Sequence, residues 1–243
     1  VAEELSEIGN SVENLNYLNS SRRIILDSDI LPEEAINYGI NAMYCFNLFS
    51  RDGTVSLDLY RTEFYNQLVV DIEDQDKLLF YNLNGSSYAN NLQLDLDYEL
   101  ISSLQMRLGY KINNTINTFN GEQKSVPLLP DYRALFNLSY TNNSKKWLFD
   151  FTINYIGSSR IPIHDKLDYE YSEQFSLINC NVTRKWDQFD FYVGAENISN
   201  YVQNNPVLGS DDWSSTLSSF DASLVYAPVH GRMIYLGFRY RIE

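Results

Sequence analysis

The chain of 243 residues carries 32 acidic and 18 basic side chains, which gives a formal net charge of −14. This balance argues against a nucleic-acid partner, because no basic patch stands out that would neutralise phosphates. No run of about 18 apolar residues occurs, which rules out a transmembrane helix but leaves room for a transmembrane barrel. Residues 1–5 are acidic and lack the apolar segment of a signal peptide, so we expect a mature or partial chain.

Alternation of apolar and polar residues, which marks a β-strand with two unlike faces, recurs along the whole chain. It begins over residues 37–48 and resumes at 55–59, after a turn at 51–53. The clearest stretch, 91–100, places four leucines and a tyrosine opposite Gln, Asp and Glu, and residues 105–113 repeat the pattern. Further alternating stretches cover 134–140, 147–155 and 234–242. We therefore predict about nine strands, several of them near the roughly 9–11 residues that a tilted membrane strand needs.

The connections between these strands differ in length in a regular way. Short connections lie near 51–54, 101–104, 142–146 and 187–188, and long ones, rich in Gly, Pro, Asn, Asp and Ser, cover 114–130, 160–173 and 201–231. The link at 73–77 breaks this order, because it is brief and its flanking strands would be unusually long. Short turns alternating with long loops are typical of outer-membrane barrels, whereas a soluble β-sandwich has no reason to sort its loops in this way.

The polar strand face predicts a lumen lined by charges that pair across neighbouring strands. The expected ion pairs join Asp95, Asp97 and Glu99 to Arg107 and Lys111, and Glu196 to Arg239 or Arg241.

The strand count has a consequence for topology. Counted back from Glu243, the last strand runs towards the periplasm, so with about nine strands Val1 would lie in an outer loop. Nine strands do not close into a barrel with both ends inside, so we expect the chain to be a piece of a larger barrel.

Motifs in four segments add a family resemblance. Leu31-Pro32-Glu33-Glu34 leads into Asn37-Tyr38-Gly39-Ile40, and the run from Val193 to Tyr201 contains Glu196-Asn197-Ile198-Ser199-Asn200. Asn205-Pro206-Val207 and Ala227-Pro228-Val229-His230-Gly231-Arg232 precede the last strand. In order and spacing these segments resemble the C-terminal barrel region of TonB-dependent receptors, particularly those of the Bacteroidetes type, from about Asn19 to the end of the chain. The terminal Tyr240-Arg241-Ile242-Glu243 departs from the aromatic residue that usually ends the family's last strand.

The resemblance implies the C-terminal portion of an antiparallel transmembrane β-barrel of roughly 22 strands with a plugged lumen. All of residues 1–243 would belong to this barrel segment, and the N-terminal plug domain would be absent from the chain. The parent protein would be an active transporter in the bacterial outer membrane, which imports a metal chelate, cobalamin, haem, a glycan or a peptide. Its partners would be outer-membrane lipid, the rest of the same receptor, the TonB complex through the missing N-terminal part, and in some members a surface lipoprotein.

Enzymatic chemistry finds little support in the sequence. No nucleophile elbow, phosphate loop or dinucleotide fingerprint occurs, His164 and His230 lack partners at ligand spacing, and we expect no cofactor. A weak calcium candidate is an acidic cluster of oxygen ligands, without the central Gly and terminal Glu of a calcium loop: Asp71, Glu73, Asp74 and Asp76. Aromatic and acidic residues of the long loops are candidates for ligand contact: Tyr169, Tyr171, Asp211, Asp212 and Trp213.

Two other classes of protein fit parts of the pattern. A passive channel or adhesin barrel would need no plug and no energy coupling. A soluble β-sandwich that binds carbohydrate would bury the same apolar faces between two sheets and fold in water without detergent.

Overall fold

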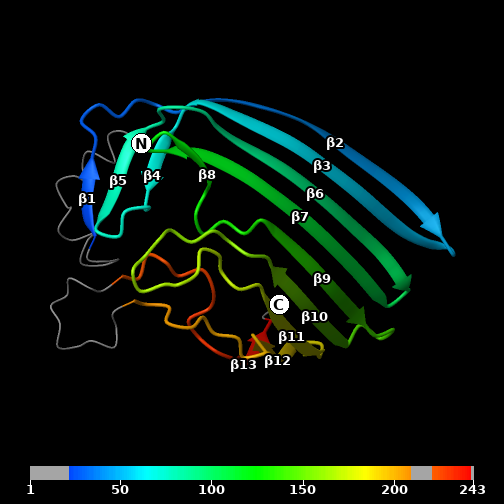
Figure 1. The fold of residues 1–243 in the computed structure, drawn as a ribbon. Coiled ribbons are helices and arrows are strands. Elements are labelled where there is room, and N and C mark those ends of the chain that lie inside the picture. The colour runs from blue at the N-terminus through cyan, green and yellow to red at the C-terminus, as the bar shows by residue number, and fades with distance from the viewer. Residues whose placement is uncertain (1–21, 209–220, 242–243) are drawn as a thin grey trace, which may run out of the picture.

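The computed structural model describes residues 22–208 and 221–241. Within these ranges all regular elements are β-strands. Nine of them form one curved antiparallel sheet, called the wall sheet here (Figure 1). The order of these nine strands across the sheet is the same as their order along the chain. This arrangement confirms the prediction of an all-β antiparallel fold with about nine strands.

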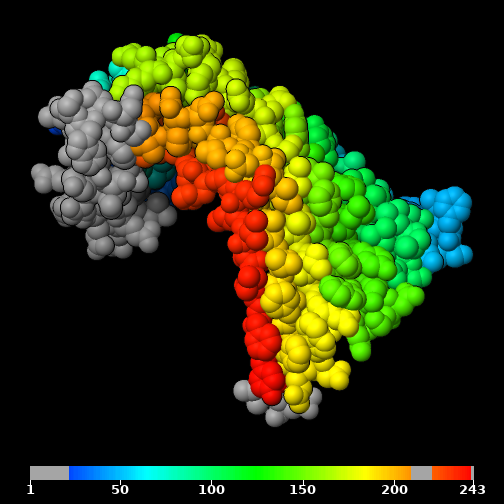
Figure 2. All heavy atoms as spheres, turned by 90° about the horizontal axis from the view of Figure 1, so that it is seen from below, coloured from blue at the N-terminus to red at the C-terminus, as the bar shows by residue number. Residues whose placement is uncertain are grey.

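The wall strands are long, and their order runs from one free edge to the other. They are β2 (Glu34–Leu48), β3 (Arg51–Asn66), β6 (Ser87–Ile101), β7 (Leu104–Phe119), β9 (Tyr132–Thr141), β10 (Trp147–Ile156), β11 (Phe175–Lys185), β12 (Phe189–Glu196) and β13 (Met233–Tyr240). A short strand, β8 (Glu122–Ser125), pairs with the end of β7. Figure 2 shows β13 in red along one free edge of the sheet, beside an open hollow.

A second, three-stranded sheet stands beyond the ends of β3 and β6. Its order is β1 (Arg23–Leu26), β5 (Lys77–Asn82) and β4 (Leu68–Asp71), with β1 parallel and β4 antiparallel to β5. The expectation of a brief link at 73–77 between two wall strands was therefore wrong. Strand β3 ends at Asn66 and β6 begins at Ser87, so this connection is long like the others, and a hairpin folds back within it. Alternation alone does not distinguish a wall strand from a hairpin strand.

With this correction, the two ends of the wall sheet differ without exception among the described strands. The short turns between β2 and β3, β6 and β7, β9 and β10, and β11 and β12 all lie at one end, the short-turn end. All long connections lie at the other end. We call them, together with residues 22–33, the loop layer: residues 67–86, 120–131, 157–174 and the described part of 197–232.

The first short turn lies earlier than the sequence predicts. Phe49 and Ser50 both have positive φ, as the two central residues of a tight hairpin turn with strand-like twist require. The Asp52-Gly53 pair, expected to form the turn, lies in β3 instead. A Cβ atom on Gly53 would approach the ring of Phe46 to 2.2 Å, so this glycine makes room for an aromatic ring on the neighbouring strand.

The convex face of the wall sheet is apolar and continuous across strands. One row in register across six strands contains Val55, Leu96, Leu108, Phe136, Ile153 and Ile178. Among the described residues no second layer covers this face: Leu108 of this row is 39% exposed, and Leu236 of the last strand is 74% exposed. Such a face needs an apolar environment outside the chain.

Aromatic rings gather at both ends of this convex face. At the short-turn end Trp147 stacks with Phe149 at 6.0 Å and Trp186 with Phe189 at 4.8 Å between ring centroids. At the opposite end the ring centroid of Tyr132 lies 6.2 Å from that of Tyr110 and 6.0 Å from that of Tyr155. Two aromatic belts that flank an apolar band are a feature of transmembrane barrels. No helix among the described residues is long and apolar enough to span a membrane.

Candidate functional site beneath the long loops

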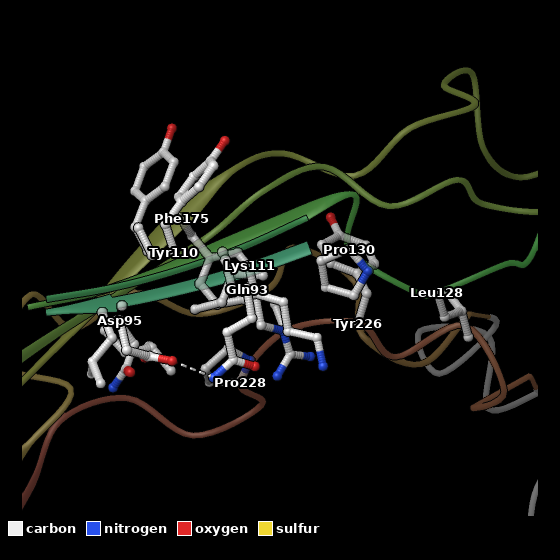
Figure 3. A pocket seen from close by; sticks show the side chains of 18 of the residues that line it. Gln93, Asp95, Tyr110, Lys111, Leu128, Pro130, Phe175, Tyr226 and Pro228 are labelled. Carbon is white, nitrogen blue, oxygen red and sulfur yellow. Dashed lines mark hydrogen bonds between the residues drawn. The ribbon is translucent and has the colours of Figure 1, made fainter. Parts of the chain in front are cut away.

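A cavity of about 560 Å³ lies on the concave side of the wall sheet, where β9 begins and β10 ends (Figure 3). The sheet forms its floor, and the segment 225–228 of the last long connection forms its roof. In Figure 3 the side chains of Gln93, Asp95 and Lys111 lie on the roof side, while Tyr110 points to the opposite, convex side. The cavity therefore opens onto the hollow of the barrel, just inside the loop layer.

Two cations occupy the floor of this cavity. Lys111 of β7 and Arg133 of β9 are direct cross-strand partners and both line the cavity. Among the described residues neither forms an ion pair or a side-chain hydrogen bond. The one carboxylate in the lining, Asp95, accepts a hydrogen bond from Gln93 Nε2 at 2.7 Å. Like charges placed directly opposite on neighbouring strands repel each other, so this floor carries an excess of positive charge that a counter-anion would relieve.

The roof is held in place by one buried side chain, Gln203, which is 4% exposed. Its Oε1 accepts hydrogen bonds from the backbone N–H groups of Tyr226 (2.9 Å) and Ala227 (3.0 Å). Its Nε2 donates to the carbonyl of Leu224 at 3.2 Å, and its own N–H donates to the carbonyl of Pro228 at 2.9 Å. The sequence analysis missed Gln203, because no local pattern marks a loop glutamine whose amide bonds to backbone more than twenty residues away.

Tyr226 is the aromatic residue of the roof. Burial raises the pKa of its hydroxyl, and the nearby hydroxyl of Tyr169 adds to this effect. Tyr226 is therefore neutral at any physiological pH, and it lines the same cavity as the two cations. Tyr169 and Tyr171, predicted to contact ligand, are 38% and 51% exposed. The other three predicted contacts, Asp211, Asp212 and Trp213, lie outside the described residues.

The loop layer around the cavity is joined by buried ion pairs between different connections. Arg160 pairs through two nitrogens with the carboxylate of Glu73, and its Nε donates to the carbonyl of Ser125 at 2.7 Å. Arg22 Nε donates to Asp221 Oδ2 at 3.0 Å. Ile161, Leu208 and Leu224 form a small apolar core beside these pairs.

Three of the four carboxylates in the acidic cluster proposed for calcium accept from protein donors. Asp71 accepts from the hydroxyl of Tyr81 at 2.8 Å, Glu73 pairs with Arg160, and Asp74 pairs with Lys77 at 3.0 Å. Asp76 N–H donates to Asp74 Oδ1 at 2.8 Å. Within residues 22–208 and 221–241, no three His, Cys, Asp or Glu side chains are grouped as metal ligands would be. The calcium site stays a prediction from sequence.

The predicted lumen ion pairs have different outcomes. Arg107 Nε lies 2.6 Å from Asp97 Oδ1, whereas Glu99 pairs with Arg51 at 3.4 Å rather than with β7.

The pair between Glu196 and Arg239 was wrong. Glu196 opposes Met233 and Arg239 opposes Asp190, so the two residues lie at opposite ends of the β12–β13 ladder. Arg241, the second predicted partner of Glu196, instead pairs with the buried Asp190 at 2.6 Å. The error is one of register, because a hairpin closed by a long loop does not reveal its pairing from sequence.

No family model and no curated protein matches the chain. Solved structures do match it. The ferric-catecholate import receptor Fiu of Escherichia coli K12 has a TM-score of 0.59 at 15% identity, over 87% of this chain and 28% of that one. The copper transporter OprC has a TM-score of 0.60 at 13% identity, over 88% and 32%. The FrpB iron transporter of Neisseria meningitidis has a TM-score of 0.56 at 13% identity, over 89% and 32%.

The chain thus spans about a third or less of the length of each of these structures. At such identities the likeness shows a shared fold and not a shared ligand. The wall sheet, its sorted connections and these matches together give the chain the fold of part of a TonB-dependent receptor barrel.

Proposed function

We propose that this chain is the C-terminal part of the barrel of a TonB-dependent outer-membrane transporter of the Bacteroidetes type. The observation that carries the proposal is the wall sheet itself, with one apolar face, one polar face, and long connections gathered at one end only. The remaining strands would close the barrel between β2 and β13, and the N-terminal plug and the TonB contact would come from the rest of the protein. A surface lipoprotein would contact the loop layer in the glycan- or peptide-importing case.

An active importer fits the mouth of this barrel better than a passive channel does. The roof segment 225–228 lies over the polar wall, and the buried pairs of Arg160 and Arg22 tie the connections to one another. A mouth closed in this way is expected of a receptor that binds its ligand before passage. It is not expected of an open, water-filled pore.

The same cavity supports a more specific proposal about the ligand. Lys111 and Arg133 would bind an anionic group of the ligand, carboxylate or phosphate, because they face each other without a counter-ion among the described residues. Tyr226 would pack against an apolar or ring portion of the ligand from the roof.

The first experiment tests the transporter itself. The native protein is extracted in detergent from outer membranes separated on a density gradient, and its intact mass and peptide map are measured. We expect a polypeptide about three times as long as this chain, given the share of the solved receptors that it covers, with a plug segment upstream. Photo-crosslinking of that segment to the periplasmic domain of TonB then tests energy coupling. A membrane barrel without a plug would favour the passive channel, and a chain that stays in the soluble fraction would contradict both.

The second experiment tests the cavity in the full-length protein. Citrate and pyrophosphate serve as anionic probes, and the melting temperature is measured for the wild type and for the variant with both Lys111→Met and Arg133→Met. We expect both probes to raise the melting temperature of the wild type and not of the variant, because bound anion stabilises the folded state by mass action. Lys124→Met, which removes an exposed loop cation paired with Glu122, is the control and should behave as wild type.

A different pattern would overturn the ligand proposal. If the double variant melts lower than wild type and neither protein responds to the probes, the two cations pair with an acidic group of the plug instead.

A further inference from the structure

Two arginines on the convex face of the wall sheet have contrasting surroundings. Arg184 is the cross-strand partner of Trp147, and both side chains belong to the apolar face at the short-turn end. The guanidinium carbon of Arg184 lies 4.8 Å from the ring centroid of Trp147 and 5.4 Å from that of Trp186. These two indole rings hold the charged group in place through cation–π contacts.

No carboxylate of the described residues balances this cation. Within residues 22–208 and 221–241, Arg184 takes part in no ion pair and no side-chain hydrogen bond. Its other cross-strand partner is Phe191. The strands on both sides of β11 are β10 and β12, so both side chains that oppose Arg184 across the sheet belong to described residues.

The second arginine, Arg61, lies on the same convex face, near the end of β3 that leads into the loop layer. Its Nε donates to Glu63 at 2.7 Å, its Nη1 donates to Asn90 at 2.9 Å, and its guanidinium carbon lies 4.6 Å from the ring centroid of Tyr88. Arg61 therefore has the carboxylate partner that Arg184 lacks, although both stack on aromatic rings. An arginine on a lipid-facing surface without a counter-ion is tolerated only near the membrane interface, where polar groups of the lipid reach it.

The position of Arg184 identifies which lipid group it would meet. It lies one residue before the end of β11, beside the aromatic belt of the short-turn end, and Lys145 and Lys146 occupy the neighbouring turn. In a barrel with short periplasmic turns, this height corresponds to the headgroups of the inner leaflet. Phosphate is the anionic group common to phospholipid headgroups, and guanidinium binds it through two parallel hydrogen bonds.

We propose that Arg184, framed by Trp147 and Trp186, is a binding site for the phosphate of a phospholipid in the periplasmic leaflet of the outer membrane. The proposal rests on the transporter function only in that the convex face must lie in the membrane. Lys145 and Lys146 add positive charge near the site and favour an anionic phospholipid over a zwitterionic one.

The test uses the full-length protein, extracted from outer membranes in mild detergent and analysed by native mass spectrometry. We expect the wild type to retain a phospholipid and Arg184→Gln to retain about tenfold less of it, the effect of losing one charge-assisted hydrogen-bonded contact. Arg61→Gln is the matched control, since it removes an arginine of the same face that already has a protein partner, and its lipid content should equal that of wild type. Arg184→Lys keeps the charge and should keep part of the binding.

Several outcomes would contradict the proposal. Equal lipid retention in wild type and Arg184→Gln, an equal loss in both glutamine variants, or retention of inorganic phosphate without lipid would each overturn the site. Heat-modifiable migration in gels shows whether each variant has folded, and Arg184→Lys serves if Arg184→Gln does not fold. Failure of the transporter proposal would show itself separately, because the wild-type protein would then be missing from the outer-membrane fraction.

Discussion

The wall sheet and the loop layer are stabilised in opposite ways. The wall sheet is regular, yet its large apolar side chains are exposed on the convex face, as Ile40 at 68% and Leu236 at 74% show. The loop layer is irregular, yet it contains most of the large, fully buried side chains, among them Arg22, Val69, Asp71, Ile161 and Pro162. The wall sheet therefore needs an apolar environment outside the chain, whereas the loop layer has a small apolar core and buried ion pairs of its own. Changes that affect one region should leave the other largely intact.

The largest effect is expected in the loop layer, from Glu73→Gln. Arg160 and Glu73 are 12% and 14% exposed in their ion pair, so the variant leaves a nearly buried guanidinium without its counter-ion. Breaking such a pair costs about 3–5 kcal/mol. Hydrogen exchange should become faster for amides of β4, β5 and residues 157–174, while the wall strands keep their protection.

The control for this prediction is Asp97→Asn in the wall sheet. It removes the carboxylate of an exposed pair with Arg107 on the concave face, at 48% and 57% exposure, and solvent screens such a pair. An equal response of the wall and loop amides to Glu73→Gln would show that the two regions unfold as one unit.

The wall sheet should respond to a charge placed on its convex face. Leu96→Arg lies in the apolar row between the two aromatic belts and should destabilise the full-length barrel in lipid vesicles by about 2–4 kcal/mol. Urea unfolding followed by tryptophan fluorescence measures this loss. Gln105→Arg places the same charge on the concave face, opposite Glu99, and should change stability little. Similar losses for both variants would contradict the assignment of the two faces.

The sequence predicted the wall sheet well because its periodicity reflects a two-sided environment. Residues 91–100 and 105–113 alternate strictly, and β6 and β7 pair there across the tight turn that the sequence also indicated. The hairpin of β4 and β5 was missed because its short apolar runs, 68–70 and 78–81, look like continuations of the wall strands, while their partners lie outside the wall. Glu196 and Arg239 were paired wrongly because the long loop before β13 leaves the register open.

The candidate site was much less predictable. Its floor was anticipated in part, since Asp95 and Lys111 were expected on the lumen face. Arg133, Gln203 and Tyr226 were not anticipated, because they meet only when separate connections fold over the wall. Such contacts depend on tertiary structure, and no pattern within one segment records them.

A smaller effect in the loop layer is expected from Tyr81→Phe. The hydroxyl of Tyr81 donates to Asp71, which is 1% exposed, and burial together with this carboxylate raises the pKa of Tyr81 to about 12. Loss of a hydrogen bond to a buried carboxylate costs about 1.5–3 kcal/mol. Hydrogen exchange in residues 68–82 should report it.

Tyr98→Phe in the wall sheet is the matched control for Tyr81→Phe. The hydroxyl of Tyr98 donates to the carbonyl of Leu48 at 2.9 Å in an exposed position at the short-turn end, where water replaces the lost partner. A loss as large as that of Tyr81→Phe would contradict the view that the cost of losing such a hydrogen bond depends on its burial.

The smallest expected effect is a pH dependence of stability that the loop layer has and the wall sheet lacks. His164 is 9% exposed, and burial lowers the pKa of its imidazole, although Asp221, at 3.9 Å from Nε2, acts in the opposite sense. The N–H of Lys166 donates to Nδ1 at 3.1 Å, so the neutral ring carries its proton on Nε2. Because its pKa is lower in the folded state than in the unfolded state, His164 binds its proton more readily when the loop layer is open.

The stability of the loop layer should therefore be constant above about pH 6.5, the ordinary pKa of histidine, and fall below it by at most about 1.4 kcal/mol per pH unit. Hydrogen exchange of residues 157–174, corrected for the intrinsic pH dependence of exchange, measures this fall. His164→Gln should remove it between pH 6.5 and 5, a range above the ordinary pKa of the aspartates, while the wall strands should show no such dependence in either protein. A pH response that persists in His164→Gln would assign the effect to another group of the loop layer.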